Sequence, residues 1–191
     1  TTIVVDFDAN LYTNNTLTVS TGINPDATYT VTVNTRNTIP VGGGSSPHST
    51  IQSALDGLFA WFGSSAFNTN TAGYLTGTKT IEVYNGTYTD EVTPNINLGT
   101  TVSENLIIRN ASGDSPVINA SGNTYGINIG NLNYTQVIGF TVHSADDDNI
   151  YCEGDNGIIS LNQSYGAVAG SGIVLNTSLN TQVNNNLVYD N

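Results

Sequence analysis

Acidic side chains cluster in one short stretch of this 191-residue chain. Three consecutive aspartates, 146–148, are followed closely by Glu153 and Asp155. We expect residues 144–156 to form a loop inserted between ordered segments. Such loops carry functional residues more often than the elements they connect. Carboxylates and backbone carbonyls in such a loop suit Ca²⁺, and a solvated acidic loop is the simpler alternative. The expected calcium ligands are Asp146, Asp148, Glu153 and Asp155.

Tyrosine is the second residue type that could bind a ligand. The chain has ten Tyr and one Trp, and only 9% of its residues are charged, compared with about 25% in typical proteins. An aromatic ring can stack on a sugar ring, while nearby Asn, Thr and Ser side chains hydrogen-bond to the sugar hydroxyls. Four tyrosines fall in predicted turns, where we expect them to be exposed and to bind carbohydrate: Tyr125, Tyr134, Tyr151 and Tyr165.

The charge balance excludes several classes of partner. The formal net charge is −12, and the basic residues are Arg36, Lys79 and Arg109. Three cations cannot form the basic patch that nucleic-acid binding requires, and an acidic polysaccharide would be repelled unless a cation bridged it. No apolar run reaches the roughly 18 residues that a membrane-spanning helix needs. Cys152 is the single cysteine, so no intrachain disulfide can form.

Two parts of the chain with different patterns must position these residues. Residues 1–47 read as an N-terminal β segment, in which apolar and polar residues alternate over 29–33, followed by a Gly- and Ser-rich loop. A helix is predicted over about 50–62, because apolar residues recur at helical spacing on one face. Ser49 is the expected N-cap of this helix, and Gln52 stands where it would complete a capping box.

The rest of the chain, within residues 48–191, is predicted to form short strands separated by Asn, Gly and Ser. A pattern that begins at Gly126 recurs from Gly172, and this shift corresponds to about two turns of a β-helix of roughly 20–25 residues each. Asparagines are expected to stack at tight corners, the run 184–186 among them. The predicted fold is an all-β, right-handed parallel β-helix, in which each turn covers the apolar side of its neighbours.

Several segments resemble the pectin-lyase-like β-helix superfamily. The stretch Ser49–Asp56 resembles the helix that opens many of these proteins, and Lys79–Tyr88 resembles the strand and turn that follow it. The sequence VIGFTV at 137–142 and the sequence NNLV at 185–188 resemble internal turns. The resemblance covers about 48–191 and implies a right-handed parallel β-helix whose first turn is capped by the helix.

The resemblance identifies the fold better than the function, because the superfamily contains lyases, hydrolases, esterases, adhesins and structural solenoids. Its lyases use Ca²⁺ with a basic residue, but Arg109 is expected to pair with an acidic neighbour such as Glu104 or Asp114. Its hydrolases carry Gly-His-Gly and Arg-x-Lys motifs, which this sequence lacks. No catalytic residue is predicted, and no cofactor is expected to be required beyond the optional Ca²⁺.

We therefore expect a secreted or cell-surface module that is not an enzyme, either an adhesin-like glycan-binding domain or a structural subunit of a surface fibre. A polysaccharide lyase or glycoside hydrolase, or a fragment of one, is the alternative. The expected partner is a polysaccharide or cell-surface glycan, or further copies of the chain end to end. End-to-end assembly is expected because residues 182–189 read as an ordinary internal turn without a cap, although the solenoid continuing beyond the chain end would explain this equally.

Overall fold

A computed structural model describes the chain except for residues 1–14, 21–27, 34–37, 44–45, 63–77 and 95–104. The chain divides into two compact units, residues 1–37 and residues 38–191. In the first unit, strands β1 (Asn15–Ser20) and β2 (Thr28–Val33) form an antiparallel pair. The strand predicted over 29–33 is therefore confirmed.

The second unit begins earlier in the sequence than predicted. Strand β3 (Thr38–Val41) pairs in parallel with β4 (Lys79–Val83), so it belongs to the solenoid. The predicted boundary at residue 47 is wrong for this reason, and the Gly- and Ser-rich loop lies within the second unit. β3 contains Pro40, which is tolerated because β3 is the end strand of its sheet.

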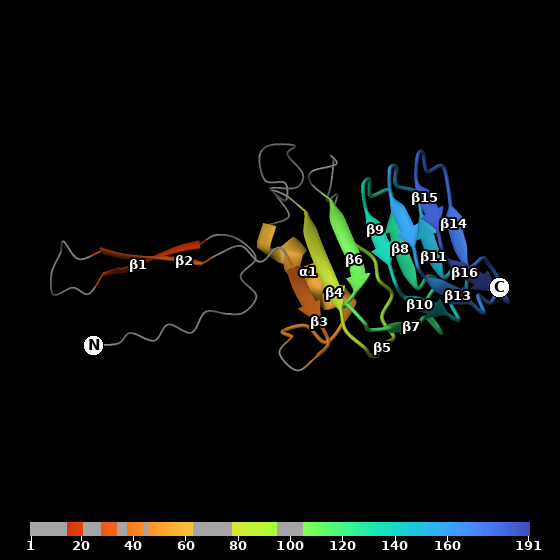
Figure 1. Cartoon of the computed structure of the whole chain (residues 1–191), viewed down its shortest axis with the longest axis horizontal. Coiled ribbons are helices and arrows are strands. Elements are labelled where there is room, and N and C mark those ends of the chain that lie inside the picture. Colours follow the sequence, from red (N-terminus) through yellow and green to blue (C-terminus); the bar gives the residue numbers. More distant parts are fainter. Residues whose placement is uncertain (1–14, 21–27, 34–37, 44–45, 63–77, 95–104) are drawn as a thin grey trace. The chain divides into compact units, whose positions relative to one another are not determined.

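The described strands of the second unit form three parallel sheets, and successive turns of the chain add strands to them (Figure 1). Sheet 1 contains β3, β4, β6 (Leu106–Asn110), β9 (Gln136–Ile138), β12 (Ile158–Ser160) and β15 (Gln182–Asn184). Sheet 2 contains β5 (Thr87–Tyr88), β7 (Val117–Asn119), β10 (Thr141–His143), β13 (Gln163–Tyr165) and β16 (Leu187–Tyr189). Sheet 3 contains β8 (Ile127–Gly130), β11 (Ile150–Cys152) and β14 (Ile173–Leu175). The predicted parallel β-helix is confirmed.

The strand register confirms the internal repeat. Ile158 of β12 lies beside Gln136 of β9 on one side and beside Gln182 of β15 on the other. The turn from Gln136 to Ile158 is therefore slightly shorter than the turn from Ile158 to Gln182. The shift seen in the sequence, from Gly126 to Gly172, spans two such turns, and β12 belongs to the turn between its two copies.

Stacked apolar side chains form the core of the solenoid. In sheet 1, Ile81, Ile108, Val137 and Ile159 stand in one inward-facing column and are fully buried. Strands in such a column are about 4.8 Å apart, so each turn depends on its neighbours to cover its apolar side. Val183 of β15 ends the column and is 45% exposed.

A ladder of asparagine side chains joins sheets 1 and 2 at their shared corner. Asn162 is 2% exposed, donates from Nδ2 to the Val137 carbonyl at 3.1 Å, and accepts the Phe140 N–H at 3.0 Å. Asn186 repeats the pattern one turn later, donating to the Ile159 carbonyl at 2.8 Å and accepting from Asn162 Nδ2 at 3.1 Å. The expected asparagine stack at 184–186 is confirmed by Asn186.

Residues with left-handed backbone angles recur at three corners. The members of each set follow one another at the same intervals as β9, β12 and β15: Tyr134, Asn156 and Asn180; Gly139, Leu161 and Asn185; Ser144, Gly166 and Asp190. Glycine and asparagine adopt this conformation with the least strain. Leu161, with φ of 59° and a side chain that is 61% exposed, fits its corner poorly.

Replacing Leu161 with Asn should therefore stabilise the solenoid. The left-handed conformation costs most L residues roughly 1–2 kcal/mol and costs Asn less, so we expect a gain of about 0.5–1 kcal/mol in the free energy of unfolding. Equilibrium unfolding in urea measures this gain. Leu179→Asn is the control, since Leu179 is 65% exposed and is not among the positive-φ residues. An equal gain in the control would attribute the effect to removing an exposed leucine and would refute the backbone explanation.

Helix α1 (Ile51–Phe62) covers the first turn of the solenoid. Ile51, Ala54, Leu55 and Leu58 are buried on one face, and the helix contacts β3 and β4. The predicted helix is confirmed, and so is its expected place over the first turn of the solenoid.

The N-cap of this helix is Thr50 and not Ser49. The helix begins at Ile51, and Thr50 Oγ1 accepts the Ser53 N–H at 3.0 Å, which is the bond expected of an N-cap residue. The prediction placed the cap one residue too early because Ser and Thr are adjacent and equally suited to it.

Gln52 bonds to a neighbouring segment instead of completing a capping box. Its side-chain Oε1 accepts the Thr93 N–H at 2.8 Å, and its Nε2 donates to the Thr93 carbonyl at 3.0 Å. The Gln52 N–H donates to Asp90 Oδ2 at 3.0 Å, so a carboxylate from the first turn supports the positive end of the helix. These bonds fasten the helix to the solenoid.

Candidate functional site

The predicted acidic loop contains a strand of sheet 3. β11 lies within residues 144–156, so the expectation of a single inserted loop is wrong. Asp148 precedes this strand, and Glu153 follows it directly. The sequence did not indicate the strand because Ile150–Cys152 is only three residues long and is surrounded by polar residues.

Two of the predicted calcium ligands join neighbouring turns. Asp148, 8% exposed, accepts the Ser171 N–H at 2.7 Å, and Asp155 accepts the Leu179 N–H at 2.7 Å. Within the described parts of the chain, no three acidic, histidine or cysteine side chains are grouped as a metal site. Calcium binding stays a prediction for its four expected ligands, Asp146, Asp148, Glu153 and Asp155.

The four predicted tyrosines are divided between strands and turns. Tyr151 lies in β11 and Tyr165 in β13, so their placement in turns is wrong. Tyr125 lies just before β8, and Tyr134 occupies a left-handed corner with φ of 54°. All four side chains are half-buried.

Tyr125 and Tyr151 form a stacked pair, and Tyr151 lies on the outer side of sheet 3. Their ring centroids are 5.0 Å apart, with 30° between the ring planes. Tyr151 Oη donates to Glu153 Oε1 at 2.6 Å, and Asn176 Nδ2 donates to Tyr151 Oη at 2.7 Å and to Glu153 Oε1 at 3.1 Å. We call Tyr125, Tyr151, Glu153 and Asn176 the tyrosine face. Asn176 was not predicted, because its role depends on the next turn lying beside β11.

Negative charge surrounds the tyrosine face. Burial raises the pKa of the Tyr125 phenol above its ordinary value, and nearby carboxylates raise it further. The pKa of Tyr151 is raised chiefly by its hydrogen bond to Glu153. Both phenols therefore remain neutral donors to a higher pH than free tyrosine. The carboxylates that act on Tyr125 are Asp147, Asp148, Glu91 and Glu153.

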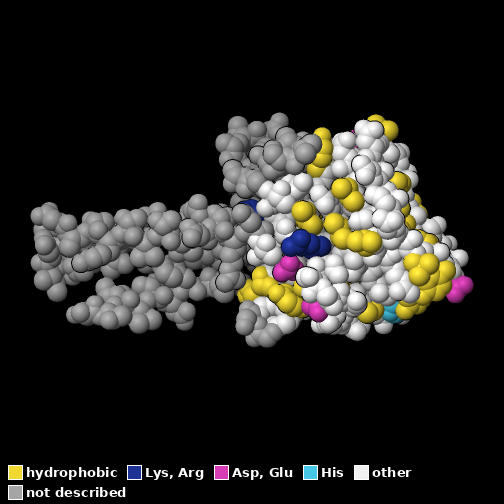
Figure 2. All heavy atoms as spheres, viewed as in Figure 1, with side chains coloured by type: hydrophobic (Ala, Val, Ile, Leu, Met, Phe, Trp, Pro, Cys, Tyr) yellow, Lys and Arg dark blue, Asp and Glu magenta, His cyan; other side chains and the backbone are white. Residues whose placement is uncertain are grey.

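The basic residues of the described chain lie in sheet 1. Lys79 is buried in β4, and Arg109 of β6 forms an ion pair with Glu82 at 3.0 Å. The expected pairing of Arg109 with Asp114 is therefore wrong, and Glu104 lies outside the described residues. Charged side chains are sparse on the face shown in Figure 2. No described cation belongs to sheet 3, and the tyrosine face is anionic.

A second aromatic column lies on the outer side of sheet 2. His143, Tyr165 and Tyr189 stack through β10, β13 and β16, with ring centroids 5.1 and 5.2 Å apart. Gln163 Nε2 donates to Tyr189 Oη at 2.7 Å. Tyr165 was expected from the sequence to bind carbohydrate, whereas His143 and Tyr189 were not. The regular spacing of the turns is the signal that aligns all three.

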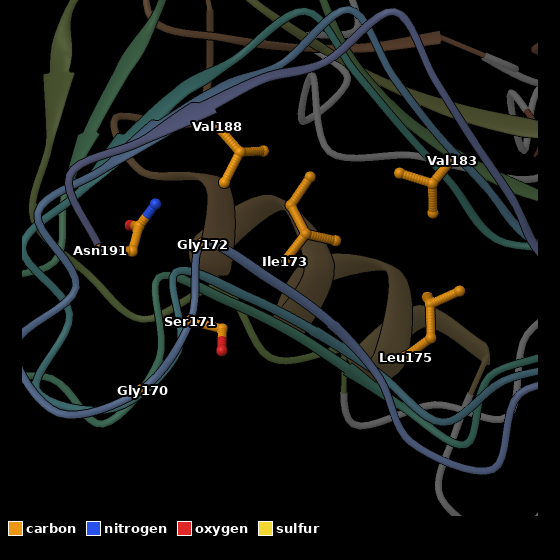
Figure 3. Close-up of a pocket in the computed structure, with 8 residues that line it drawn as sticks. All are labelled: Gly170, Ser171, Gly172, Ile173, Leu175, Val183, Val188 and Asn191. Atoms are coloured by element: carbon orange, nitrogen blue, oxygen red, sulfur yellow. The ribbon is translucent and has the colours of Figure 1, made fainter.

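An apolar hollow of about 450 Å³ opens where β14, β15 and β16 lie. Ile173, Leu175, Val183 and Val188 point into it (Figure 3). Val183 and Val188 continue the inward-facing columns of sheets 1 and 2, so the hollow is the end of the core and not a separate cleft. The tyrosine face is the better candidate site because it combines aromatic and polar groups.

These features define a parallel β-helix, the fold that the sequence resemblance predicted. The structure of a pectin methylesterase from Aspergillus niger, in deglycosylated form, is similar to this chain with a TM-score of 0.50 and 16% sequence identity. The similarity covers 78% of this chain and 50% of the esterase, so this chain spans about half the length of that protein. At this identity the similarity shows the fold alone.

No protein-family profile matches the sequence, and neither does any curated protein. Among the described helical residues, none form a helix that is long and apolar enough to cross a membrane.

Proposed function

We propose that this chain is a secreted or cell-surface carbohydrate-binding module without enzymatic activity, and that its binding surface is the tyrosine face. The observation that carries the proposal is the stacked pair of Tyr125 and Tyr151, in which the Tyr151 hydroxyl is fixed by Glu153 and Asn176. Carbohydrate sites combine aromatic surface with a few polar groups of fixed orientation. The tyrosine face has both.

The tyrosine face is also rigid before any ligand binds. The Tyr151 ring is held by stacking on Tyr125, and its hydroxyl is held by two side chains. Little side-chain entropy is therefore lost on binding. The neighbouring strands of sheet 3 place Asn128 and Val174 beside Tyr151, so the stacked tyrosines form a single local contact for a sugar ring.

Tyr151→Ala should weaken glycan binding at least about tenfold, because it removes the ring stack and the hydroxyl together. Aromatic contacts are worth roughly 0.5–1.5 kcal/mol beyond their buried area, and a hydrogen bond adds about 1 kcal/mol. Calorimetric titration against a panel of neutral and charged cell-wall oligosaccharides measures the loss. Tyr151→Phe keeps the ring and should lose less.

Tyr189→Ala is the matched control for this experiment. Tyr189 is also a stacked tyrosine, but it is exposed and lies on sheet 2. The control should bind glycans as the unmodified chain does, and urea unfolding of both variants checks that they fold. If Tyr189→Ala loses binding and Tyr151→Ala keeps it, the site is the column on sheet 2 and our assignment is wrong.

Two other expectations from the sequence stay predictions. End-to-end assembly into a fibre would bury the hollow lined by Ile173 and Val183. Polysaccharide cleavage would need a catalytic group that the sequence does not predict. The proposed binding role requires neither of them.

A further inference from the structure

Each residue of the stacked tyrosine pair is hydrogen-bonded to a carboxylate. Glu153 follows β11 and bonds to Tyr151 through Oε1. Glu91 comes from an earlier turn, and its Oε2 accepts the Tyr125 N–H at 3.5 Å. Thr93 Oγ1 donates to Glu91 Oε1 at 3.0 Å, which holds that carboxylate beside Tyr125. Two anchored negative charges thus adjoin the tyrosine pair, one at each of its residues.

The hydrogen bonds of Glu153 leave part of its carboxylate available to a ligand. Its described bonds, from Tyr151 Oη and Asn176 Nδ2, both go to Oε1. A cation that approached Oε2 would lie near the hydroxyl end of Tyr151, which bonds to the other oxygen of the same carboxylate. Ammonium groups form charge-assisted hydrogen bonds with carboxylates, and they are also attracted by the faces of aromatic rings.

The same charges act against an acidic sugar. The described basic residues, Lys79 and Arg109, lie in sheet 1, so no described cation of sheet 3 would neutralise a uronic acid there. The formal net charge of −12 adds a general repulsion at low ionic strength. An uncharged sugar would gain the aromatic contact without the ionic one.

From this geometry we infer that the tyrosine face selects sugar polymers that carry free, protonated amino groups over their N-acetylated, uncharged and uronic-acid counterparts. The inference rests on the proposed function, because it names the ligand class of the same site. The ring stack supplies contact with the sugar, and the flanking carboxylates supply the selectivity for the amine.

The test compares oligomers of glucosamine, N-acetylglucosamine, glucose and galacturonic acid by calorimetric titration, in slightly acidic buffer containing a chelator. We expect the glucosamine oligomer to bind at least about tenfold more tightly than the others at low salt, since a carboxylate and a ring face both attract the ammonium group. This preference should largely disappear at about 1 M salt, where the Debye length is about 3 Å.

Glu153→Gln separates charge from shape in this test. A glutamine Oε1 can still accept from Tyr151 and Asn176, so the face keeps its arrangement but loses one charge. Binding of the glucosamine oligomer should weaken about threefold to tenfold, clearly more than binding of the N-acetylated oligomer. Asp190→Asn is the control, because it removes the same charge from an exposed left-handed position that asparagine tolerates.

The possible outcomes distinguish the inference from the proposed function. Equal binding of acetylated and free-amine oligomers, or equal weakening by Asp190→Asn and Glu153→Gln, overturns the amine selectivity but leaves a glycan site. Tighter binding of the galacturonic acid oligomer overturns the selectivity as well. If none of these oligomers, nor any member of the wider panel, binds in a manner that depends on Tyr151, both the inference and the proposed function are wrong.

Discussion

Gly154→Ala should lower the free energy of unfolding by about 3 kcal/mol or more, at the upper end of the range for overpacked sites. Gly154 lies against the backbone of Leu132 in the preceding turn, and a Cβ at position 154 would overlap the Leu132 carbonyl group. A flexible side chain could move aside, but backbone in a stacked turn cannot do so without separating the turns. Urea unfolding followed by circular dichroism measures the loss.

Gly86→Ala is the control for this substitution. A Cβ at Gly86 would meet the Tyr88 ring at 3.4 Å, an ordinary van der Waals contact, and Gly86 does not have a positive φ. We expect a change of less than about 1 kcal/mol. Comparable losses in the two variants would show that glycine as such, and not the approach to Leu132, determines stability at position 154.

Asn162→Ala should destabilise the solenoid by about 2–5 kcal/mol, because each buried polar group that loses its partner costs about 1–3 kcal/mol. The substitution removes the partner of the Phe140 N–H and of the Val137 carbonyl, in a position that is 2% exposed. The change in urea midpoint, at an unchanged dependence on urea concentration, measures the cost.

Asn186→Ala tests the same bond pattern one turn later. Asn186 is only half-buried, so water can replace part of what its amide provides. We expect a loss of about 1 kcal/mol, clearly smaller than that of Asn162→Ala. A larger loss at Asn186 than at Asn162 would contradict the idea that burial makes the ladder important.

The fold could be predicted where apolar residues follow a clear period. The structure confirms the predicted apolar helix face, which contains Ile51, Leu55 and Leu58. It also confirms the repeat from Gly126 to Gly172. The sequence does not indicate β13, because its inward-facing residue is Ser164, which is fully buried and donates to the Gly172 carbonyl. A polar residue in the core breaks the alternation by which a strand is identified.

The site could be predicted in its members but not in its arrangement. Tyr125, Tyr151 and Glu153 were chosen for their residue types, and stacking and hydrogen bonds bring them together. Asn176 joins them because β14 lies beside β11, and that register depends on the length of each turn. An extra or a missing residue in a turn would place a different side chain beside Tyr151. Composition alone therefore could not identify the cluster.

The left-handed corners also show which side of the solenoid tolerates variation. From Asn156 to Gly166, and again from Asn180 to Asp190, the chain passes through sheets 1 and 2 in segments of equal length. The return through sheet 3 is longer from Gly166 to Asn180 than from Ser144 to Asn156. The side that carries the tyrosine face therefore differs in length between successive turns, while the other two sides keep theirs.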